Sequence, residues 1–181
     1  LYQKIEFETS WRGPANWLAA RNVVPQFLDP AYPASSHYTA RGDLPLDLGA
    51  THFVGLAGVG LDAADYRPFD PATEHKRGAF GYDRSLSLEE IKQGRGLSNL
   101  AVMIQVPHDG PAGVTPWIAG GGASVRGVPE KNSIAPFILG ADRDGKAITH
   151  NGQRGAFVLM ADGSVRFLSQ NIKDEVFQAL V

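Results

Sequence analysis

An Asp-Gly pair between two apolar runs constrains the fold of this chain more than any other feature. Asp162-Gly163 lies between residues 157–160 and 165–168. The pair is typical of a two-residue type I′ hairpin turn, because both central residues of that turn need positive φ. The predicted register pairs Met160 with Val165. It gives one wholly apolar face of Val158, Met160, Val165 and Phe167, and one mixed face of Phe157, Leu159, Arg166 and Leu168. Since an isolated hairpin is marginal in water, this one must pack on the rest of the domain.

Composition and turn residues indicate one globular domain of short elements. The chain has 181 residues, of which 43% are hydrophobic and 20% charged, enough for a single domain spanning residues 1–181. The 21 glycines and 12 prolines indicate long loops. Besides the hairpin, residue patterns predict strands over 51–58, 78–82, 100–106 and 134–139, and helices over 16–24, 87–91 and 171–180. We therefore predict an α+β fold built on an antiparallel β-sheet, with few short helices and long loops.

Capping residues predict where these helices begin. Asn16 would cap the first helix, and Ser87 followed by Glu90 fits a capping box. Asn171 would cap the last helix, whose predicted apolar face holds Ile172, Val176 and Leu180.

Charge and cysteine content exclude several classes of protein. With 17 Lys+Arg against 19 Asp+Glu, the net charge of -2 offers no basic surface for nucleic acid or an anionic membrane. The absence of cysteine excludes disulfides, thiolate metal sites and a cysteine nucleophile. No apolar run approaches the ~18–20 residues that span a bilayer. We expect the chain to be part of a longer protein, whose preceding segment would supply any export signal or membrane anchor.

No motif predicts a coherent catalytic or metal site. Asp142-Arg143-Asp144-Gly145 matches only the start of a calcium-binding loop, and Gln153 stands where that loop needs a glutamate. A plain turn is favoured, with calcium at Asp142 and Asp144 as the open alternative. The five histidines show no metal-ligand spacing. A serine-hydrolase elbow is missing, since the nearest string, residues 122–127, has the wrong spacing. We predict no enzyme activity, no metal and no cofactor.

Aromatic and glycine-rich segments are the candidate contact surfaces. Trp117, the run Gly120-Gly121-Gly122 and Arg166 on the mixed hairpin face are predicted to contact a ligand or a partner. Together with Trp117, Trp11 and Trp17 would line a sugar-stacking surface. Packing within the fold is the favoured interpretation of these tryptophans.

Several segments, taken in order, resemble one family of proteins. They are VPQFLDP (24–30), THFVGLAG (51–58), GAFG (78–81), LEEI (88–91), GLSN (96–99), and His150 followed by DGSVRFL (162–168). In series they look like the prepilin-type proteins that have a large domain of unknown function and a C-terminal H-x9-DG signature. The resemblance covers residues 1–172, and its motif residues at the C-terminal end are His150, Asp162 and Gly163.

This resemblance implies a pilin-like fold, export and membrane anchoring through an N-terminal helix that precedes Leu1. It implies no catalytic residues. The sequence departs from the family pattern at four places. Eleven residues, rather than nine, separate His150 from Asp162, and Asp29 replaces a cysteine. The family's D-G-x-S-N-T segment appears as QGRGLSNL (93–100), and Gln105 replaces an acidic residue.

The function expected from the sequence is that of a non-enzymatic, extracytoplasmic pilin- or pseudopilin-like module. It would act in the cell envelope, in the periplasm or at the cell surface, in assembly of a surface structure or a type II secretion system. Its partners would be proteins, including other pilin-like subunits, and not nucleic acid. The alternative is a module that binds glycans or small ligands through its tryptophans and glycine-rich loop. A hydrolase has no coherent set of residues behind it.

Overall fold

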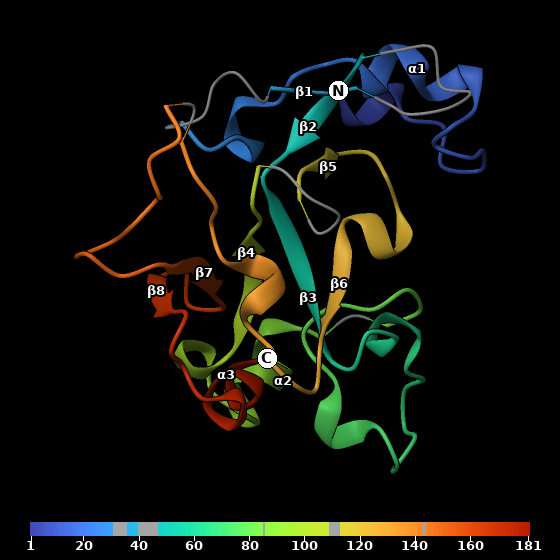
Figure 1. The fold of residues 1–181 in the computed structure, drawn as a ribbon. Coiled ribbons are helices and arrows are strands. Elements are labelled where there is room, and N and C mark those ends of the chain that lie inside the picture. The colour runs from blue at the N-terminus through green and yellow to red at the C-terminus, as the bar shows by residue number, and fades with distance from the viewer. Residues whose placement is uncertain (31–35, 40–46, 85, 109–112, 143) are drawn as a thin grey trace.

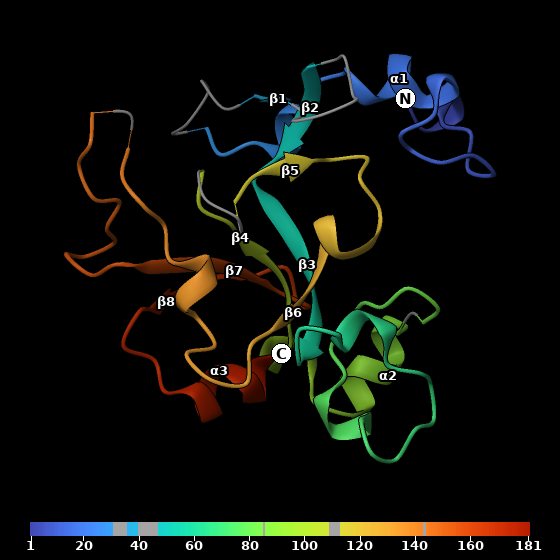
Figure 2. The ribbon, with the colours of Figure 1, turned by 45° about the vertical axis from the view of Figure 1, so that its right-hand side comes forward.

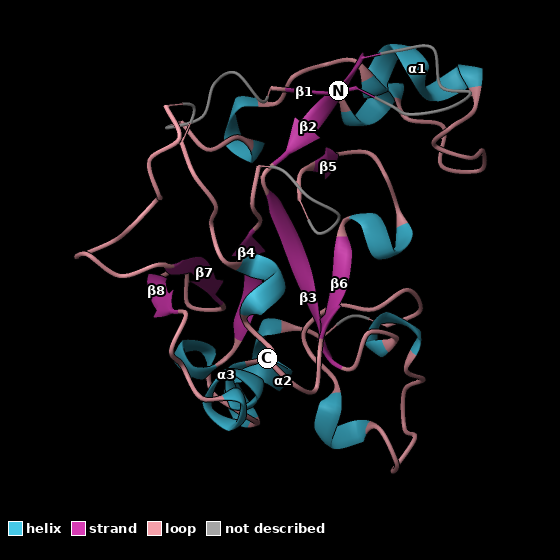
Figure 3. Ribbon diagram, in the orientation of Figure 1, coloured by secondary structure: helices cyan, strands magenta, loops and turns pink. Residues whose placement is uncertain are grey.

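The predicted α+β fold is confirmed by a computed structural model, which describes residues 1–30, 36–39, 47–84, 86–108, 113–142 and 144–181 (Figures 1 and 3). The α-helices of the described residues are α1 (Pro14–Ala20), α2 (Leu88–Gln93) and α3 (Asp174–Leu180). The strands are β1 (His37–Thr39), β2 (Asp47–Thr51), β3 (Phe53–Val59), β4 (Ala101–Gln105), β5 (Thr115–Pro116), β6 (Val125–Val128), β7 (Gly155–Met160) and β8 (Val165–Ser169). No helix among these residues is long and apolar enough to cross a membrane.

Two sheets, rather than one, make up the β-structure. The larger sheet has the order β6-β3-β4-β7-β8 and the smaller one the order β1-β2-β5. Neighbours pair antiparallel except β3 and β6, which run parallel. Gly127 of β6 passes so close to Gly60 that an added Cβ would overlap the Gly60 carbonyl oxygen. A glycine is needed there because only a residue without a side chain allows this approach.

The main core lies on one face of the larger sheet. Buried side chains at alternate positions of its strands, such as Val54 and Leu56 of β3 and Val158 and Met160 of β7, share one apolar cluster with the last helix. Phe177 of α3 is fully buried. Ile172 and Leu180 of the predicted face pack against this core, but the prediction for Val176 was wrong, because Val176 is 51% exposed and Phe177 is buried instead.

The hairpin forms at Asp162-Gly163, but its register differs by one residue from the prediction. Gly163 has φ +83°, whereas Asp162 has no positive φ. Gly163 N–H donates to Met160 O at 3.0 Å, and Met160 N–H donates to Ser164 O at 2.8 Å. These bonds define a three-residue loop with glycine in the left-handed position, which is a common alternative to type I′.

The shift moves side chains to the other face of the hairpin, as any one-residue slip does. Phe157 now pairs with Phe167, and Leu159 with Val165. The buried face holds Ala156, Val158, Met160 and Leu168. We call Phe157, Leu159, Val165 and Phe167 the outer hairpin face.

Four further predictions of local structure were wrong. Asn171 does not cap the last helix, because α3 begins at Asp174 and its N-cap residue is Lys173. Residues 134–139 form a 3-10 turn at Ala135–Phe137, because Pro136 suits the first turn of a helix. Residues 78–82 form no continuous strand, although Gly78 N–H still bonds to Ala57 O beside β3 at 2.8 Å. Helix α1 begins at Pro14. Asn16 lies inside it, where its side chain binds the backbone N–H and C=O of Glu6 at 2.9 and 3.1 Å.

Two local predictions were confirmed. Ser87 and Glu90 make both bonds of a capping box at the start of α2. The apolar run at 100–106 forms β4, in the middle of the larger sheet.

Candidate functional site

Trp117 is a packing residue in the structure. Its indole N–H donates to Asn22 O at 2.8 Å, and its ring centroid lies 6.2 Å from that of Phe27. It lies against Gly49, where an added Cβ would come within 2.8 Å of the indole nitrogen. Trp117 therefore ties the segment after α1 to the smaller sheet.

The residues of the predicted contact surface do not form one surface. Gly120, Gly121 and Gly122 make an exposed turn that precedes β6, next to the Tyr82 hydroxyl. Arg166 is exposed on β8, at the opposite edge of the larger sheet. Trp17 donates its indole N–H to Arg12 O at 2.9 Å, so this tryptophan belongs to the N-terminal segment.

His150 and Asp162 both support the structure of the hairpin, His150 on its outer face and Asp162 at its loop. The His150 ring packs on the outer hairpin face, 5.4 Å from the Phe157 centroid and 4.9 Å from that of Phe167. At the loop, Asp162 Oδ1 accepts hydrogen bonds from Ser164 Oγ–H at 2.6 Å and from Ser164 N–H at 2.9 Å. These bonds from Ser164 lower the pKa of the Asp162 carboxyl. Asp162 is thus a turn-stabilising residue.

The Asp142 segment forms a turn, as favoured from the sequence. Asp142 Oδ1 accepts the backbone N–H of Asp144 at 3.0 Å and that of Lys146 at 2.9 Å. Gly145 N–H donates to Asp142 O at 3.0 Å and closes the turn. Position 143 lies outside the described residues.

A buried polar cluster lies where the two sheets meet, and it is the strongest candidate site. His52, between β2 and β3, is 0% exposed, and its Nδ1 accepts a hydrogen bond from Asp29 N–H at 2.8 Å. Gln105 at the end of β4 donates from Nε2 to Asp29 Oδ2 at 2.7 Å. His108 Nε2 lies 3.6 Å from the same carboxylate oxygen. The rings of His52 and His108 meet edge to face at 4.9 Å.

Backbone bonds fix this cluster in place. His52 N–H donates to Phe27 O at 2.8 Å, and Val106 N–H donates to His52 O at 2.9 Å. The hydrogen bond from Asp29 N–H assigns the His52 proton to Nε2, since an Nδ1 that accepts cannot carry one. The cluster thereby joins three segments of chain: the turn before Asp29, the corner between the sheets, and the end of β4.

The chemistry open to this cluster is narrow. The side chains of His108 and Asp29 are only 5% and 14% exposed, so the cluster is largely enclosed. Within the described ranges, no three His, Cys, Asp or Glu side chains are arranged to hold a metal ion. The geometry fits a polar crosslink between segments better than an open acid–base site.

Sequence reasoning missed this cluster because its members are distant in the chain. Asp29 and His52 are 23 positions apart, and Asp29 and Gln105 are 76 apart. The one signal available was that Asp29 and Gln105 are two of the positions at which the sequence departs from the pattern that it otherwise resembles.

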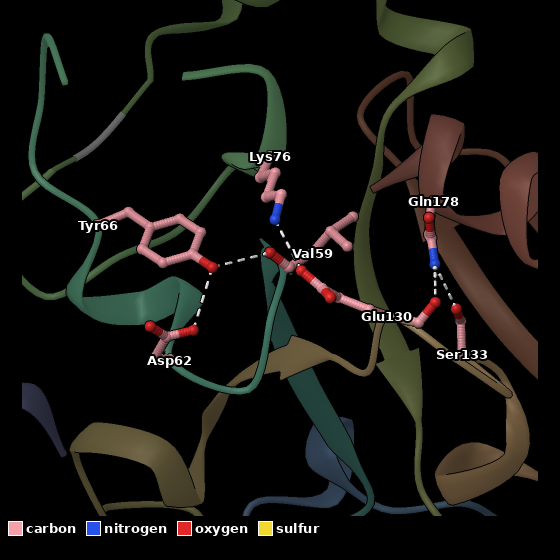
Figure 4. Close-up of polar contacts among 7 residues, drawn as sticks. All are labelled: Val59, Asp62, Tyr66, Lys76, Glu130, Ser133 and Gln178. Carbon is pink, nitrogen blue, oxygen red and sulfur yellow. Dashed lines mark hydrogen bonds and ion pairs between the residues drawn. The ribbon is translucent and has the colours of Figure 1, made fainter. Parts of the chain in front are cut away.

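A second polar network anchors the segment that follows β3 (Figure 4). The Tyr66 hydroxyl lies 3.1 Å from Val59 O and 3.0 Å from Asp62 Oδ1. Burial, followed by the contact with Asp62, raises the pKa of Tyr66. Lys76 Nζ contacts Glu130 Oε1 at 2.6 Å, which raises the pKa of Lys76 and lowers that of Glu130.

The same network continues to α3. Gln178 Nε2 donates to Glu130 O and to Ser133 Oγ, each at 2.8 Å. The loop before Ser133 is also held by Asp174, whose carboxylate accepts the backbone N–H of Ser133 at 2.8 Å and that of Asn132 at 2.9 Å. These bonds lower the pKa of Asp174.

Arg84 also holds the segment after β3 in place, through hydrogen bonds to the backbone. Its guanidinium donates to the carbonyl oxygens of Ala57, Ala63, Tyr66 and Phe80. Burial lowers the pKa of Arg84, with a smaller contribution from Arg77. No motif in the sequence indicated this role.

Comparison with known proteins adds no relative to these observations. No family model, no curated protein and no solved structure matches the chain.

Proposed function

We propose that this chain is a non-enzymatic, pilin- or pseudopilin-like module of the cell envelope, placed outside the cytoplasm. It acts by associating with other proteins, including pilin-like subunits, in a surface structure or a type II secretion system. In this proposal, membrane attachment comes through an N-terminal helix that precedes Leu1.

The observation that carries the proposal is that segments with the family resemblance pack against one another. The hairpin loop rests on the segment at 97–100, because Asp162 N–H donates to Leu97 O at 3.1 Å and Ala161 N–H donates to Leu100 O at 2.8 Å. Leu100 in turn clusters with Ala79 and Ile91. A shared fold explains why these segments resemble the family, and it requires no catalytic role for their residues.

The two family departures in the polar cluster support the same interpretation. Asp29 and Gln105 form one hydrogen-bonded pair. A carboxylate at both positions would place two like charges within hydrogen-bonding distance, whereas the amide of Gln105 supplies a donor. The residues at both positions are therefore compatible with one direct contact between the segments that they join.

The variant Asp29→Asn tests whether this cluster has a structural or a chemical role. It removes the negative charge beside His108 and keeps the backbone N–H that binds His52. The full gene product carrying Asp29→Asn should restore the phenotype of cells that lack the protein, provided that its melting temperature stays close to that of the wild type. Loss of the phenotype at unchanged stability would show that the carboxylate has a chemical function, and would contradict the proposal.

A further inference from the structure

Asn151 and Gly152 form an exposed two-residue turn in the connection that leads into β7. Asn151 has φ +51° and Gly152 has φ +75°. On either side of them, His150 N–H donates to Gln153 O at 2.9 Å, and Gln153 N–H donates to His150 O at 3.0 Å. Positive φ at both central residues is the mark of a type I′ turn, for which Asn-Gly is a preferred pair. All four residues are exposed, and Figures 1 and 2 both show the orange connection before β7 extending away from the larger sheet.

An asparagine followed by glycine can lose its side-chain amide through attack by its own backbone. The backbone nitrogen of Gly152 attacks Asn151 Cγ, so that an N–C bond forms and the Cγ–Nδ2 bond breaks. The Nδ2 group leaves as ammonia, together with the proton that the Gly152 nitrogen loses. The product is a succinimide ring, which water then opens. Addition of water at Cγ gives aspartate, whereas addition at the backbone carbonyl carbon gives isoaspartate, whose main chain runs through Cβ.

The structure distinguishes this turn from two similar ones. The Asp-Gly pairs of the described residues, at 144–145 and 162–163, also lie in turns. In each of them the glycine N–H donates to a backbone carbonyl oxygen at 3.0 Å, so that its nitrogen is engaged. Gly152 N–H makes no hydrogen bond to any residue that the structure describes, and neither does the Asn151 side chain. The attacking nitrogen and the amide that it would attack are therefore both available.

Few contacts hold this turn closed. Attack requires rotation about the Asn151 Cα–C bond, which brings the Gly152 nitrogen toward Cγ. The two hydrogen bonds between His150 and Gln153 oppose this rotation, but nothing beyond its chain neighbours lies within 4 Å of a Cβ built on Gly152. Segments with few packed contacts open locally at a low cost in free energy. The reactive conformation is thus accessible while the sheet stays folded.

We propose that Asn151 is a site of spontaneous deamidation, and that isoaspartate formed there releases His150 from the outer hairpin face. Isoaspartate adds one methylene group to the main chain, which breaks the match between a two-residue loop and the paired residues His150 and Gln153. The His150 ring lies 4.9 Å from the Phe167 centroid and 5.4 Å from that of Phe157. Loss of this packing uncovers both rings, and the new carboxylate adds a negative charge to the turn.

Peptide mapping by mass spectrometry tests the site, on the purified chain incubated at mildly alkaline pH. The mass increase that accompanies conversion of an amide to a carboxylic acid should appear at Asn151, with the isoaspartate and aspartate peptides separated by chromatography. Asn132 is the internal control, because it is exposed and has the same φ of +51°. The N–H that follows it, however, donates to the Asp174 carboxylate at 2.8 Å. Asn151 should react at least about tenfold faster than Asn132.

The variant Asp162→Asn supplies a matched Asn-Gly pair whose glycine N–H is engaged. Since Gly163 N–H donates to Met160 O, the amide at position 162 should be lost at least about tenfold more slowly than that of Asn151 in the same folded chain. In urea, where both turns are open, the two rates should become similar. A folded chain in which Asn151 keeps its amide, or loses it no faster than position 162 does, would overturn the inference.

Nuclear magnetic resonance follows the consequence for His150. The neighbouring Phe157 and Phe167 rings shift its ring protons, and this shift should be lost in the isoaspartate fraction. Asn151→Asp is the control for charge, because aspartate tolerates the left-handed region and keeps the turn, so its His150 signals should match those of the untreated chain. Unchanged His150 signals in the isoaspartate fraction would contradict the release of this ring. The proposed function does not depend on these results, because Asp29→Asn tests it independently.

Discussion

Replacing Gly163 by alanine isolates the conformational cost of the hairpin loop. Gly163 has φ +83°, and nothing lies within 4 Å of a Cβ built on it. An alanine there meets no neighbour, so its cost is that of an L-residue in the left-handed region, about 1–2 kcal/mol. Gly120 is the matched control, because its added Cβ is equally open but its φ is −73°. Gly120→Ala should be neutral, or stabilising by up to about 1 kcal/mol through the unfolded chain.

Urea unfolding of the two variants measures this difference. Gly163→Ala should lower the free energy of unfolding by about 1–2 kcal/mol, which lowers the melting temperature by about 2–8 °C in a domain of this size. Gly163→Asn should recover much of the loss, because asparagine tolerates the left-handed region. Equal free energies of unfolding for Gly163→Ala and Gly120→Ala would refute the left-handed conformation at position 163.

Three further substitutions test other parts of the fold. His52→Ala leaves Asp29 N–H without its acceptor, whereas the side-chain oxygen of His52→Asn can replace Nδ1. The free energy of unfolding should therefore be about 1–3 kcal/mol lower for His52→Ala than for His52→Asn. Equal free energies of unfolding would mean that this hydrogen bond does not stabilise the fold. Trp117 is only partly buried, so Trp117→Ala should lower the free energy of unfolding by about 0.5–3 kcal/mol, and an unchanged urea midpoint would show that the indole is not a packing residue. The pKa of Asp174 is lowered in the folded state, so its stabilisation is present above the unfolded-state pKa and is lost as the pH falls through the folded-state pKa. Melting temperatures measured down through this acid range should therefore fall less steeply for Asp174→Asn than for the wild type, and parallel curves would contradict this role.

Local sequence signals predicted local structure well. The capping box at Ser87, the buried strand β4 and the position of the hairpin loop all follow from residues close together in the chain. The register of the hairpin was missed because two- and three-residue loops both accept an Asp-Gly pair, and only φ at Asp162 distinguishes them. That angle depends on the bonds that Asp162 makes with Ser164 and the 97–100 segment.

Non-local contacts account for what the sequence did not reveal. The parallel pairing of β6 with β3 depends on the close approach of Gly127 to Gly60, which no periodic pattern encodes. The polar cluster likewise depends on a fold that brings His52 and Gln105 to Asp29. Packing was the favoured interpretation of Trp117, but its partner could not be predicted, because the room for the indole comes from the small size of Gly49, which is distant in the chain.

The mature N-terminus of the protein in its native cells tests the central claim most directly. Intact-mass analysis and N-terminal sequencing of the isolated protein should find a processed, methylated first residue followed by an apolar segment of about 20 residues. The protein should also fractionate with the cell envelope. An unprocessed N-terminus without an apolar segment, on a protein recovered from the cytoplasm, would contradict a pilin-like module.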